Sequence, residues 1–182
     1  MDYTNCADRV LVSEDEIKEI CKRLGKQISK DYEGKNLLVV SVLKGAIIFM
    51  ADILREITVP CKIDFMSVSS YSGRKNTGVV KFKKDLDINP DGCDILIVED
   101  ILDSGVTLAY LKKVLLDRNA KSIKVCTLLD KPANRKADIK ADYVGKVIPD
   151  EFVIGYGLDY YEYCRNLPYV GILAHEFYEN DL

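Results

Sequence analysis

The sequence has no tryptophan, a single histidine (His175) and no long apolar run. Its longest strongly apolar stretches, Leu37–Val40 and Ala46–Ala51, are far shorter than the roughly 20 residues that a helix needs to cross a membrane. The first ten residues include two aspartates and no apolar segment. We therefore expect neither a secretory signal peptide nor a membrane partner.

The sequence also lacks a large excess of charge of one sign. It has 26 Lys and Arg residues and 29 Asp and Glu residues, which gives a net charge of −3. This balance argues against a protein that binds nucleic acid through a dense basic face. No two of the six cysteines lie closer than fifteen positions, which excludes C-x-x-C and zinc-type pairs. We expect reduced thiols and a cytoplasmic location.

Apolar strands alternate with helices along the chain, and its 182 residues match the length of one domain. The first clear element is a helix that begins at the capping box Ser13–Glu16 and continues with apolar residues at helical spacing from Ile17 to Ile28. The alternation predicts a single α/β domain, residues 1–182, with a doubly wound, mostly parallel sheet and helices on both faces. We predict two further helices, Gly45–Ile57 and Val106–Leu116, and strands over Leu37–Leu43, Ile63–Ser69, Val79–Lys83, Ile95–Val98, Ile123–Leu129, Tyr143–Ile148, Phe152–Ile154 and Tyr169–Leu173.

The segment after the predicted strand Ile95–Val98 carries the clearest chemistry. Three acids, Glu99, Asp100 and Asp103, come where ligands bind in such sheets, beyond the carboxyl ends of the strands. Residues Ser104–Thr107 then open a helix, and the unpaired N–H groups and dipole of a helix N-terminus suit a phosphate. Acids beside a phosphate imply sugar hydroxyls or a divalent cation between them. The segment therefore predicts a site for a sugar phosphate with Mg²⁺.

Residues Ile95–Thr107 resemble the phosphoribosyl-pyrophosphate signature of type I phosphoribosyltransferases. They read as four apolar residues, two acids, two apolar residues and then Asp-Ser-Gly-x-Thr. The resemblance is to the hypoxanthine-guanine branch of this family and extends from about Arg9 to Val170. The other segments that carry it are Leu43–Gly45, Ser70–Tyr71, Leu129–Lys131, Phe152–Tyr160 and Arg165–Pro168.

This resemblance implies a type I phosphoribosyltransferase fold with a small hood formed from the chain ends and a mobile lid loop at about 70–84, which includes Ser70 and Tyr71. It implies a purine salvage enzyme that transfers the phosphoribosyl group from phosphoribosyl pyrophosphate to hypoxanthine or guanine, giving IMP or GMP and pyrophosphate. The implied cofactor is Mg²⁺, and the implied partners are a 6-oxopurine base, phosphoribosyl pyrophosphate and further copies of the chain in a homodimer or homotetramer. A preference for xanthine is one alternative, and a regulator that keeps the nucleotide site without catalysis is another.

The resemblance also implies a role for each matched residue. Asp103 is the general base that faces N7 of the purine, and a carboxylate can accept that proton. The phosphoribosyl group is held by Glu99, Asp100, Asp103, Ser104, Gly105, Val106 and Thr107. Pyrophosphate is held by Lys44, Gly45 and Arg165, with a cis peptide bond before Lys44, and the metal by Glu99, Asp100 and Asp159. The purine is bound by Lys131, Phe152, Val153 and Asp159, with Lys131 donating to the 6-oxo group.

Simpler structural interpretations stay open for several of these residues. Asp103 or Ser104 can serve as the N-cap of an ordinary helix, with the acids at the surface. Lys131 can be a solvated loop lysine, since two further lysines follow it closely. Phe152 and Val153 can be core residues of a strand. The sequence alone does not rank hypoxanthine, guanine and xanthine as substrates.

Overall fold

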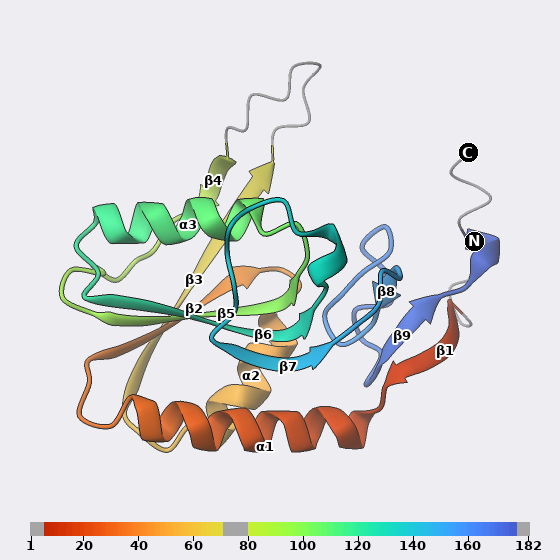
Figure 1. Cartoon of the computed structure of the whole chain (residues 1–182), viewed down its shortest axis with the longest axis horizontal. Coiled ribbons are helices and arrows are strands. Elements are labelled where there is room, and N and C mark those ends of the chain that lie inside the picture. The colour runs from red at the N-terminus through yellow and green to blue at the C-terminus, as the bar shows by residue number, and fades with distance from the viewer. Residues whose placement is uncertain (1–5, 71–79, 178–182) are drawn as a thin grey trace.

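The computed structural model describes residues 6–70 and 80–177, which form two β-sheets and three α-helices (Figure 1). The main sheet has six strands in the order β4-β3-β2-β5-β6-β7. All neighbours in it are parallel except β3 and β4, which are antiparallel. Its strands are β2 (Leu37–Leu43), β3 (Cys61–Ser70), β4 (Val80–Lys84), β5 (Asp94–Leu102), β6 (Ser122–Asp130) and β7 (Tyr143–Val147).

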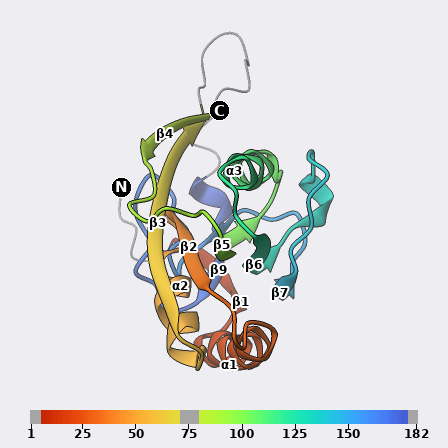
Figure 2. The same cartoon turned by 90° about the vertical axis from the view of Figure 1, so that its left-hand side faces the viewer.

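Helices cover both faces of the main sheet (Figures 1 and 2). The helices α1 (Glu14–Asp31) and α2 (Ile47–Glu56) lie on one face, and α3 (Val106–Asp117) lies on the other. Successive side chains of a strand point to opposite faces, so a strand buried on both faces is apolar throughout. In β5, Leu96 and Val98 pack with α1 and α2, whereas Ile95 and Ile97 pack with α3.

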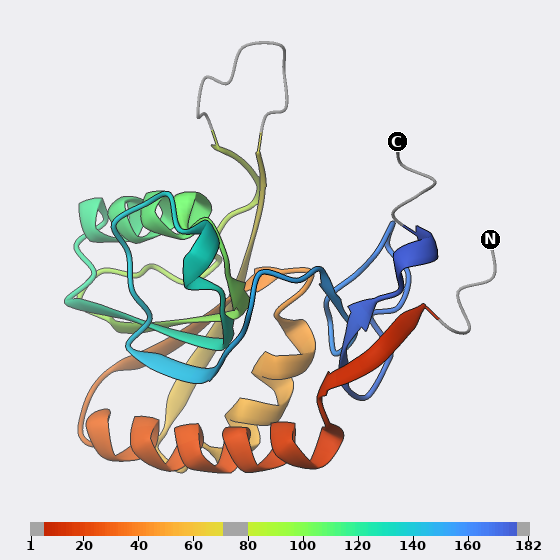
Figure 3. The same cartoon turned by 45° about the vertical axis from the view of Figure 1, so that its right-hand side comes forward.

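A small antiparallel sheet, β1-β9-β8, joins the two ends of the described chain. Its strands are β1 (Ala7–Val12), β8 (Val153–Ile154) and β9 (Val170–Leu173). This sheet is the hood, and it lies beyond the carboxyl ends of β2, β5 and β6 (Figure 3). Two short 3-10 helices, η1 (Pro132–Asn134) and η2 (His175–Phe177), complete the described elements.

The predicted fold class is confirmed, and most element boundaries agree within two residues. The first helix is confirmed, but no strand was predicted before it, and β1 precedes it and pairs with a strand about 160 positions later. The predicted end of strand Ile95–Val98 is wrong. Strand β5 continues to Leu102 because Glu99 still pairs with Thr127 on β6. Glu99 and Asp100, two of the three acids expected after this strand, therefore lie inside it, and only Asp103 follows its end.

Several smaller expectations concern the ends of elements. The Glu16 backbone N–H donates to Ser13 Oγ at 3.2 Å, which confirms the predicted start of α1. The predicted lid begins at Ser70, the last residue of β3, and Ser70 pairs with Val80 at the start of β4. Tyr71 and the rest of 71–79 lie outside the described residues. All six cysteines are unpaired, as expected, and within the described ranges no helix is long and apolar enough to cross a bilayer.

Candidate active site

The loops after β5 and β6, together with the hood, line two adjoining cavities at the carboxyl edge of the main sheet. The larger has a volume of about 190 Å³ and the smaller, at the start of α3, about 130 Å³. Ile101 and Asp103 line both, so Asp103 stands at their boundary. The larger is lined by Ile101, Asp103, Lys131, Glu151, Phe152, Val153, Leu158 and Asp159, and the smaller by Glu99, Ile101, Asp103, Ser104, Gly105, Thr107 and Leu108.

Glu99 and Asp100 lie on opposite faces of β5, because they are successive residues of one strand. Glu99 lines the cavity at the start of α3, whereas Asp100 lies against Gly45 on the α2 side. Burial raises the pKa of Glu99 well above its usual range, and the neighbouring Asp100 adds to the rise. Burial also raises the pKa of Asp100 to about 6, with Arg165 opposing the rise and Asp159 adding to it. Both carboxylates are therefore costly to ionise until a cation or hydroxyl donor reaches them.

The N-terminus of α3 has no side-chain cap within the described residues. Its N-cap is Gly105, with φ 75°, and no side chain of the described residues makes a capping hydrogen bond there. The alternative in which Asp103 or Ser104 caps this helix is therefore wrong. The first N–H groups of a helix have no partner within the helix, so this end can bind an anion. Val106 and Thr107 form the first turn, and Thr107 and Ser104 border the smaller cavity.

Three backbone carbonyls at the turn between β5 and α3, those of Leu102, Asp103 and Ser104, are bonded to the segment that follows η1. Arg135 Nη2 donates to the carbonyl of Leu102 (3.0 Å), and Arg135 Nε donates to that of Asp103 (2.9 Å). The carbonyl of Ser104 accepts from the backbone N–H groups of 136–137 at 2.9 and 3.1 Å. With its carbonyls held on that side, the turn can present N–H groups to a ligand on the other.

Arg135 is a functional residue that the sequence did not reveal. Its Nη1 donates to the carbonyl of Ile139 at 2.8 Å, and its Nη2 also pairs with the Asp130 carboxylate at the end of β6. A Cβ atom on Gly105 would lie 3.1 Å from Arg135 Cδ and 2.5 Å from Ile139 Cγ2. The glycine therefore allows close packing as well as a left-handed conformation. Nothing in the sequence distinguishes this arginine from others in polar loops.

Lys131 is buried rather than solvated, with only 10% of its side chain exposed. Its Nζ lies 3.2 Å from Asp150 Oδ1, 3.6 Å from Asp103 Oδ2 and 3.4 Å from the carbonyl of Glu151. The other carboxylate oxygen of Asp103, Oδ1, is buried and has no hydrogen-bond partner among the described residues. The larger cavity is thus lined by a buried cation and by the Asp103 carboxylate beside it.

The hood contributes an aromatic wall to this cavity. Phe152 is 42% exposed and makes an edge contact with Tyr160, with ring centroids 6.0 Å apart. Its exposure contradicts the interpretation that it is a core strand residue, whereas Val153 beside it is buried. The Phe152 ring can therefore stack on a flat ligand, and Val153 can offer only backbone atoms to it.

The turn after β2 packs closely on its neighbours, and its Leu43–Lys44 peptide bond is cis. A Cβ atom on Gly45 would lie 1.8 Å from Asp100 Oδ2, so no side chain fits there. A Cβ atom on Gly157, which has φ 102°, would lie 2.0 Å from the carbonyl oxygen of Gly45. Glycine at both positions brings three backbone segments together beside Asp100.

Arg165 joins this cluster from the loop after β8. Its Nη1 donates to the carbonyl of Gly157 at 2.7 Å, and its Nη2 pairs with Asp159 Oδ1 at 2.8 Å. The same Nη2 lies 3.4 Å from Glu162 Oε2, and Lys44 Nζ donates to that oxygen at 2.7 Å. The structure therefore brings together the predicted pyrophosphate-binding residues, and it adds Glu162, which the sequence did not reveal.

The three predicted metal ligands do not form one cluster. Among residues 6–70 and 80–177, no three His, Cys, Asp or Glu side chains gather closely enough to hold a metal ion on their own. The physical reason is the strand register, which places Glu99 and Asp100 on opposite faces. Asp100 and Asp159 are close enough for Asp159 to raise the pKa of Asp100. This repelling pair fits a cation such as Mg²⁺, which usually takes one or two carboxylates and completes its shell with substrate oxygens and water.

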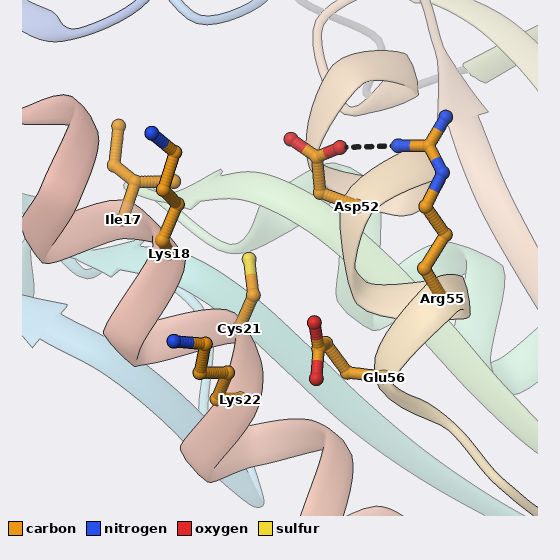
Figure 4. Close-up of a pocket in the computed structure, with 7 residues that line it drawn as sticks. All are labelled: Ile17, Lys18, Cys21, Lys22, Asp52, Arg55 and Glu56. Carbon is orange, nitrogen blue, oxygen red and sulfur yellow. Dashed lines mark hydrogen bonds and ion pairs between the residues drawn. The ribbon is translucent and has the colours of Figure 1, made fainter.

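Another cavity, of about 300 Å³, lies between α1 and α2 (Figure 4). Both oxygens of its Asp52 carboxylate are bonded, one to Arg55 (2.6 Å) and the other to the Tyr156 hydroxyl (2.6 Å). Tyr156 precedes Gly157, so this contact anchors the segment that packs on Gly45. None of the predicted site residues reaches this cavity, which is lined by Ile17, Lys18, Cys21, Lys22, Asp52, Arg55 and Glu56.

Comparison with known proteins shows the family to which this chain belongs. The family model of the phosphoribosyl transferase domain matches residues 12–161. A hypoxanthine-guanine phosphoribosyltransferase of Staphylococcus aureus is 52% identical over 177 residues, which is 97% of this chain and 99% of that protein. A crystal structure of a hypoxanthine phosphoribosyltransferase from the same species has a TM-score of 0.93 and 52% identity, covering 96% of this chain and 95% of that one.

Other relatives differ in length. The bifunctional protein TilS/HprT of Listeria monocytogenes is 54% identical over 175 residues, which is 96% of this chain but only 27% of that protein. This chain therefore spans about a quarter of the length of that relative. A hypoxanthine-guanine phosphoribosyltransferase structure from Bacillus anthracis has a TM-score of 0.88 and 46% identity, covering 92% of this chain and 99% of that one.

The role of Arg135 can be tested by Arg135→Met, which keeps the apolar stem and removes every donor. The carbonyls of Leu102 and Asp103 and the Asp130 carboxylate then lose a partner. We expect the free energy of unfolding to fall by about 2–4 kcal/mol in denaturant titrations. The matched control is Arg118→Met, which breaks an exposed two-bond pair with Asp85 and should cost at most about 1 kcal/mol. Equal losses in the two variants would contradict the role given to Arg135.

The burial of Asp100 predicts a pH-dependent stability. Its pKa is about 6 in the folded protein and near 3.8 when exposed, so its contribution favours folding below about pH 3.8 and is lost as the pH rises through about 6. Asp100→Asn removes this ionisation. Without substrate or metal, the variant should be more stable than the wild type at pH 8 by about 1–3 kcal/mol. Denaturant titrations should show a smaller gain at pH 4.5, and an equal gain at both pH values would contradict the assignment.

Proposed function

Because the chain belongs to the phosphoribosyltransferase family, we propose that it transfers the phosphoribosyl group of phosphoribosyl pyrophosphate to hypoxanthine or guanine and releases pyrophosphate. One observation carries this proposal: Asp103 stands between a cavity that contains a buried cation and a cavity at an uncapped helix N-terminus. A purine in the first and a ribose 5′-phosphate in the second would meet beside its carboxylate.

The reaction forms a bond between a purine nitrogen and C1 of the ribose and breaks the bond from C1 to pyrophosphate. The purine loses a proton as it bonds, and the carboxylate of Asp103, which lines both cavities, accepts it. Lys131 Nζ donates to the 6-oxo group, and Phe152 stacks on the ring. Val153 contacts the base edge through its backbone. These groups hold the base in line with C1, which is the main requirement of a displacement.

The sugar phosphate is proposed to lie over α3. The N–H groups from Gly105 to Thr107 and the hydroxyls of Ser104 and Thr107 donate to the 5′-phosphate. Glu99, which lines the same cavity, accepts hydrogen bonds from the ribose hydroxyls, and this contact stabilises a carboxylate that burial otherwise disfavours. Asp100 lies on the other face of β5, beside Gly45, and would act on the phosphoribosyl group through Mg²⁺.

Pyrophosphate leaves between the turn after β2 and the loop that carries Arg165. Gly45 leaves room for backbone N–H groups to approach an anion, while Lys44 and Arg165 supply positive charge, Arg165 through two donor nitrogens. Mg²⁺ would be held by Asp100 and Asp159 with pyrophosphate oxygens, and it would neutralise charge on the leaving group. The protein is proposed to act in the cytoplasm as a homodimer or homotetramer.

The proposed activity is tested by turnover. Purified protein with Mg²⁺, phosphoribosyl pyrophosphate and hypoxanthine should form IMP and pyrophosphate, and activity should vanish in EDTA and return with Mg²⁺. Asp103→Asn keeps the size of the side chain but removes its charge, so kcat should fall by about 10²–10⁴ while phosphoribosyl pyrophosphate still binds. A wild-type protein without turnover on hypoxanthine, guanine or xanthine would refute the proposal. A variant within threefold of wild type would remove Asp103 from the chemistry.

The buried ammonium of Lys131 predicts the choice of base. Adenine carries an amino group in place of the 6-oxo group, so a charged donor would face a second donor, at a cost of roughly 2–5 kcal/mol. The value of kcat/KM for adenine should be at least about 30-fold below that for hypoxanthine. In Lys131→Gln, the side-chain carbonyl can face the amino group, so the ratio should shrink, whereas Lys136→Gln at an exposed position should preserve it. An unchanged ratio in Lys131→Gln would place the selectivity elsewhere, for example at the backbone of Val153.

A further inference from the structure

Glu162 places a carboxylate oxygen between the two cations that are proposed to bind pyrophosphate. Its Oε2 lies 2.7 Å from Lys44 Nζ and 3.4 Å from Arg165 Nη2, so a single oxygen bridges both. The hydrogen bond from Lys44 lowers the pKa of Glu162, and the carboxylate is ionised near neutral pH. A phosphate oxygen that bridged a lysine and an arginine would make the same kind of contact.

The backbone holds Glu162 in this position. Tyr160 and Tyr163 exchange two backbone hydrogen bonds (3.2 and 2.9 Å), and the residues between them, Tyr161 and Glu162, have φ of 48° and 69°. Such a turn is adopted most readily by Asn-Gly, and a non-glycine residue in the left-handed region persists only where its surroundings fix it. The Glu162 N–H also donates to Asp159 Oδ2 at 3.0 Å. The carboxylate is therefore presented by a fixed turn rather than by a flexible loop.

The neighbours of this oxygen belong to the proposed site of the leaving group. Lys44 follows the cis peptide after β2, and Arg165 contacts Gly157, which packs on the carbonyl of Gly45. While the Glu162 carboxylate is paired with Lys44 and Arg165, pyrophosphate cannot form its own ion pairs with these two cations in full. The pair between Lys44 and Glu162 is largely exposed, at 66% and 62% of the side chains, so it can be broken at little cost.

We propose that Glu162 is an internal competitor of pyrophosphate: its carboxylate neutralises Lys44 and Arg165 in the ligand-free protein, is displaced when the pyrophosphate group binds, and returns as the product leaves. This inference rests on the proposed roles of Lys44 and Arg165. Because the competing carboxylate favours the ligand-free state, it weakens binding of both phosphoribosyl pyrophosphate and pyrophosphate and limits inhibition by the product. Glu162 is in this sense a residue that sets affinity and does not touch the reacting atoms.

The test is the affinity of pyrophosphate, measured by calorimetry at a fixed Mg²⁺ concentration without the base. Glu162→Gln keeps the shape of the side chain and removes its charge, so pyrophosphate should bind roughly twofold to fivefold more tightly, as expected for the loss of an exposed ion pair. The KM for phosphoribosyl pyrophosphate should fall by a similar factor. The matched control is Glu19→Gln, because Glu19 forms a pair of similar exposure with Lys22 at 2.8 Å, away from the site. It makes the same change in net charge and should leave both values unaltered.

A second variant separates this inference from the proposed function. Arg165→Gln should weaken pyrophosphate binding, and in the double variant the effect of Glu162→Gln should shrink, since one of the two shared cations is gone. If Arg165→Gln weakens binding while Glu162→Gln leaves it unchanged or weakens it, the internal competitor is refuted and the proposed site stands. If Arg165→Gln leaves pyrophosphate binding unchanged, the proposed role of Arg165 fails, and the inference fails with it.

Discussion

The rest of the candidate site depends on the hydrogen bonds that Arg135 donates to the turn between β5 and α3. The end of β5 must turn sharply into a helix while its carbonyls stay away from an anion. Arg135 and the backbone after it bond the carbonyls of Leu102, Asp103 and Ser104. The same guanidinium pairs with Asp130, at the end of β6 and next to Lys131. One side chain thus fixes both the turn proposed to bind phosphate and the end of β6, next to the buried Lys131.

A second constraint is the strand register, which distributes the acids. Because β5 continues through the acidic residues, Glu99 faces the cavity at α3 and Asp100 faces the turn after β2. One strand therefore presents acids to two parts of the candidate site from its two faces. Burial raises the pKa of both carboxyl groups, so their ionised forms are disfavoured at this edge of the ligand-free protein. A bound cation or bound hydroxyl groups would lower the free-energy cost of ionising these carboxyl groups. Ligand binding and the ionisation of Glu99 and Asp100 are therefore coupled.

The sequence predicted the parts of this site that are local in the chain and missed those that arise from pairing across it. Alternation and apolar runs predicted the main sheet, and the run Ile95–Thr107 predicted the phosphate-binding turn. Strand β1 was missed because β9, with which it pairs, is about 160 residues away, and a short half-exposed strand has no strong pattern of its own. Arg135 and Glu162 were missed for a related reason. Their importance lies in what they contact, and isolated charged residues in loops are common in any soluble domain.

The charges of the site show why its substrates need several simultaneous contacts. Lys131 lies near Asp150 and Asp103, and Lys44 pairs with Glu162, so these cations already have acidic partners before a ligand binds. Arg165 has two such partners. In the proposed reaction, a phosphate or an oxo group must replace these existing ion pairs. The net free energy of binding gained from each new contact is therefore small. Discrimination then comes from the contacts that a wrong ligand leaves unmade, because a buried donor without a partner costs more than a made hydrogen bond gains. In the proposed reaction, the buried Lys131 would therefore select strongly, whereas the exposed Lys44 would mainly adjust affinity.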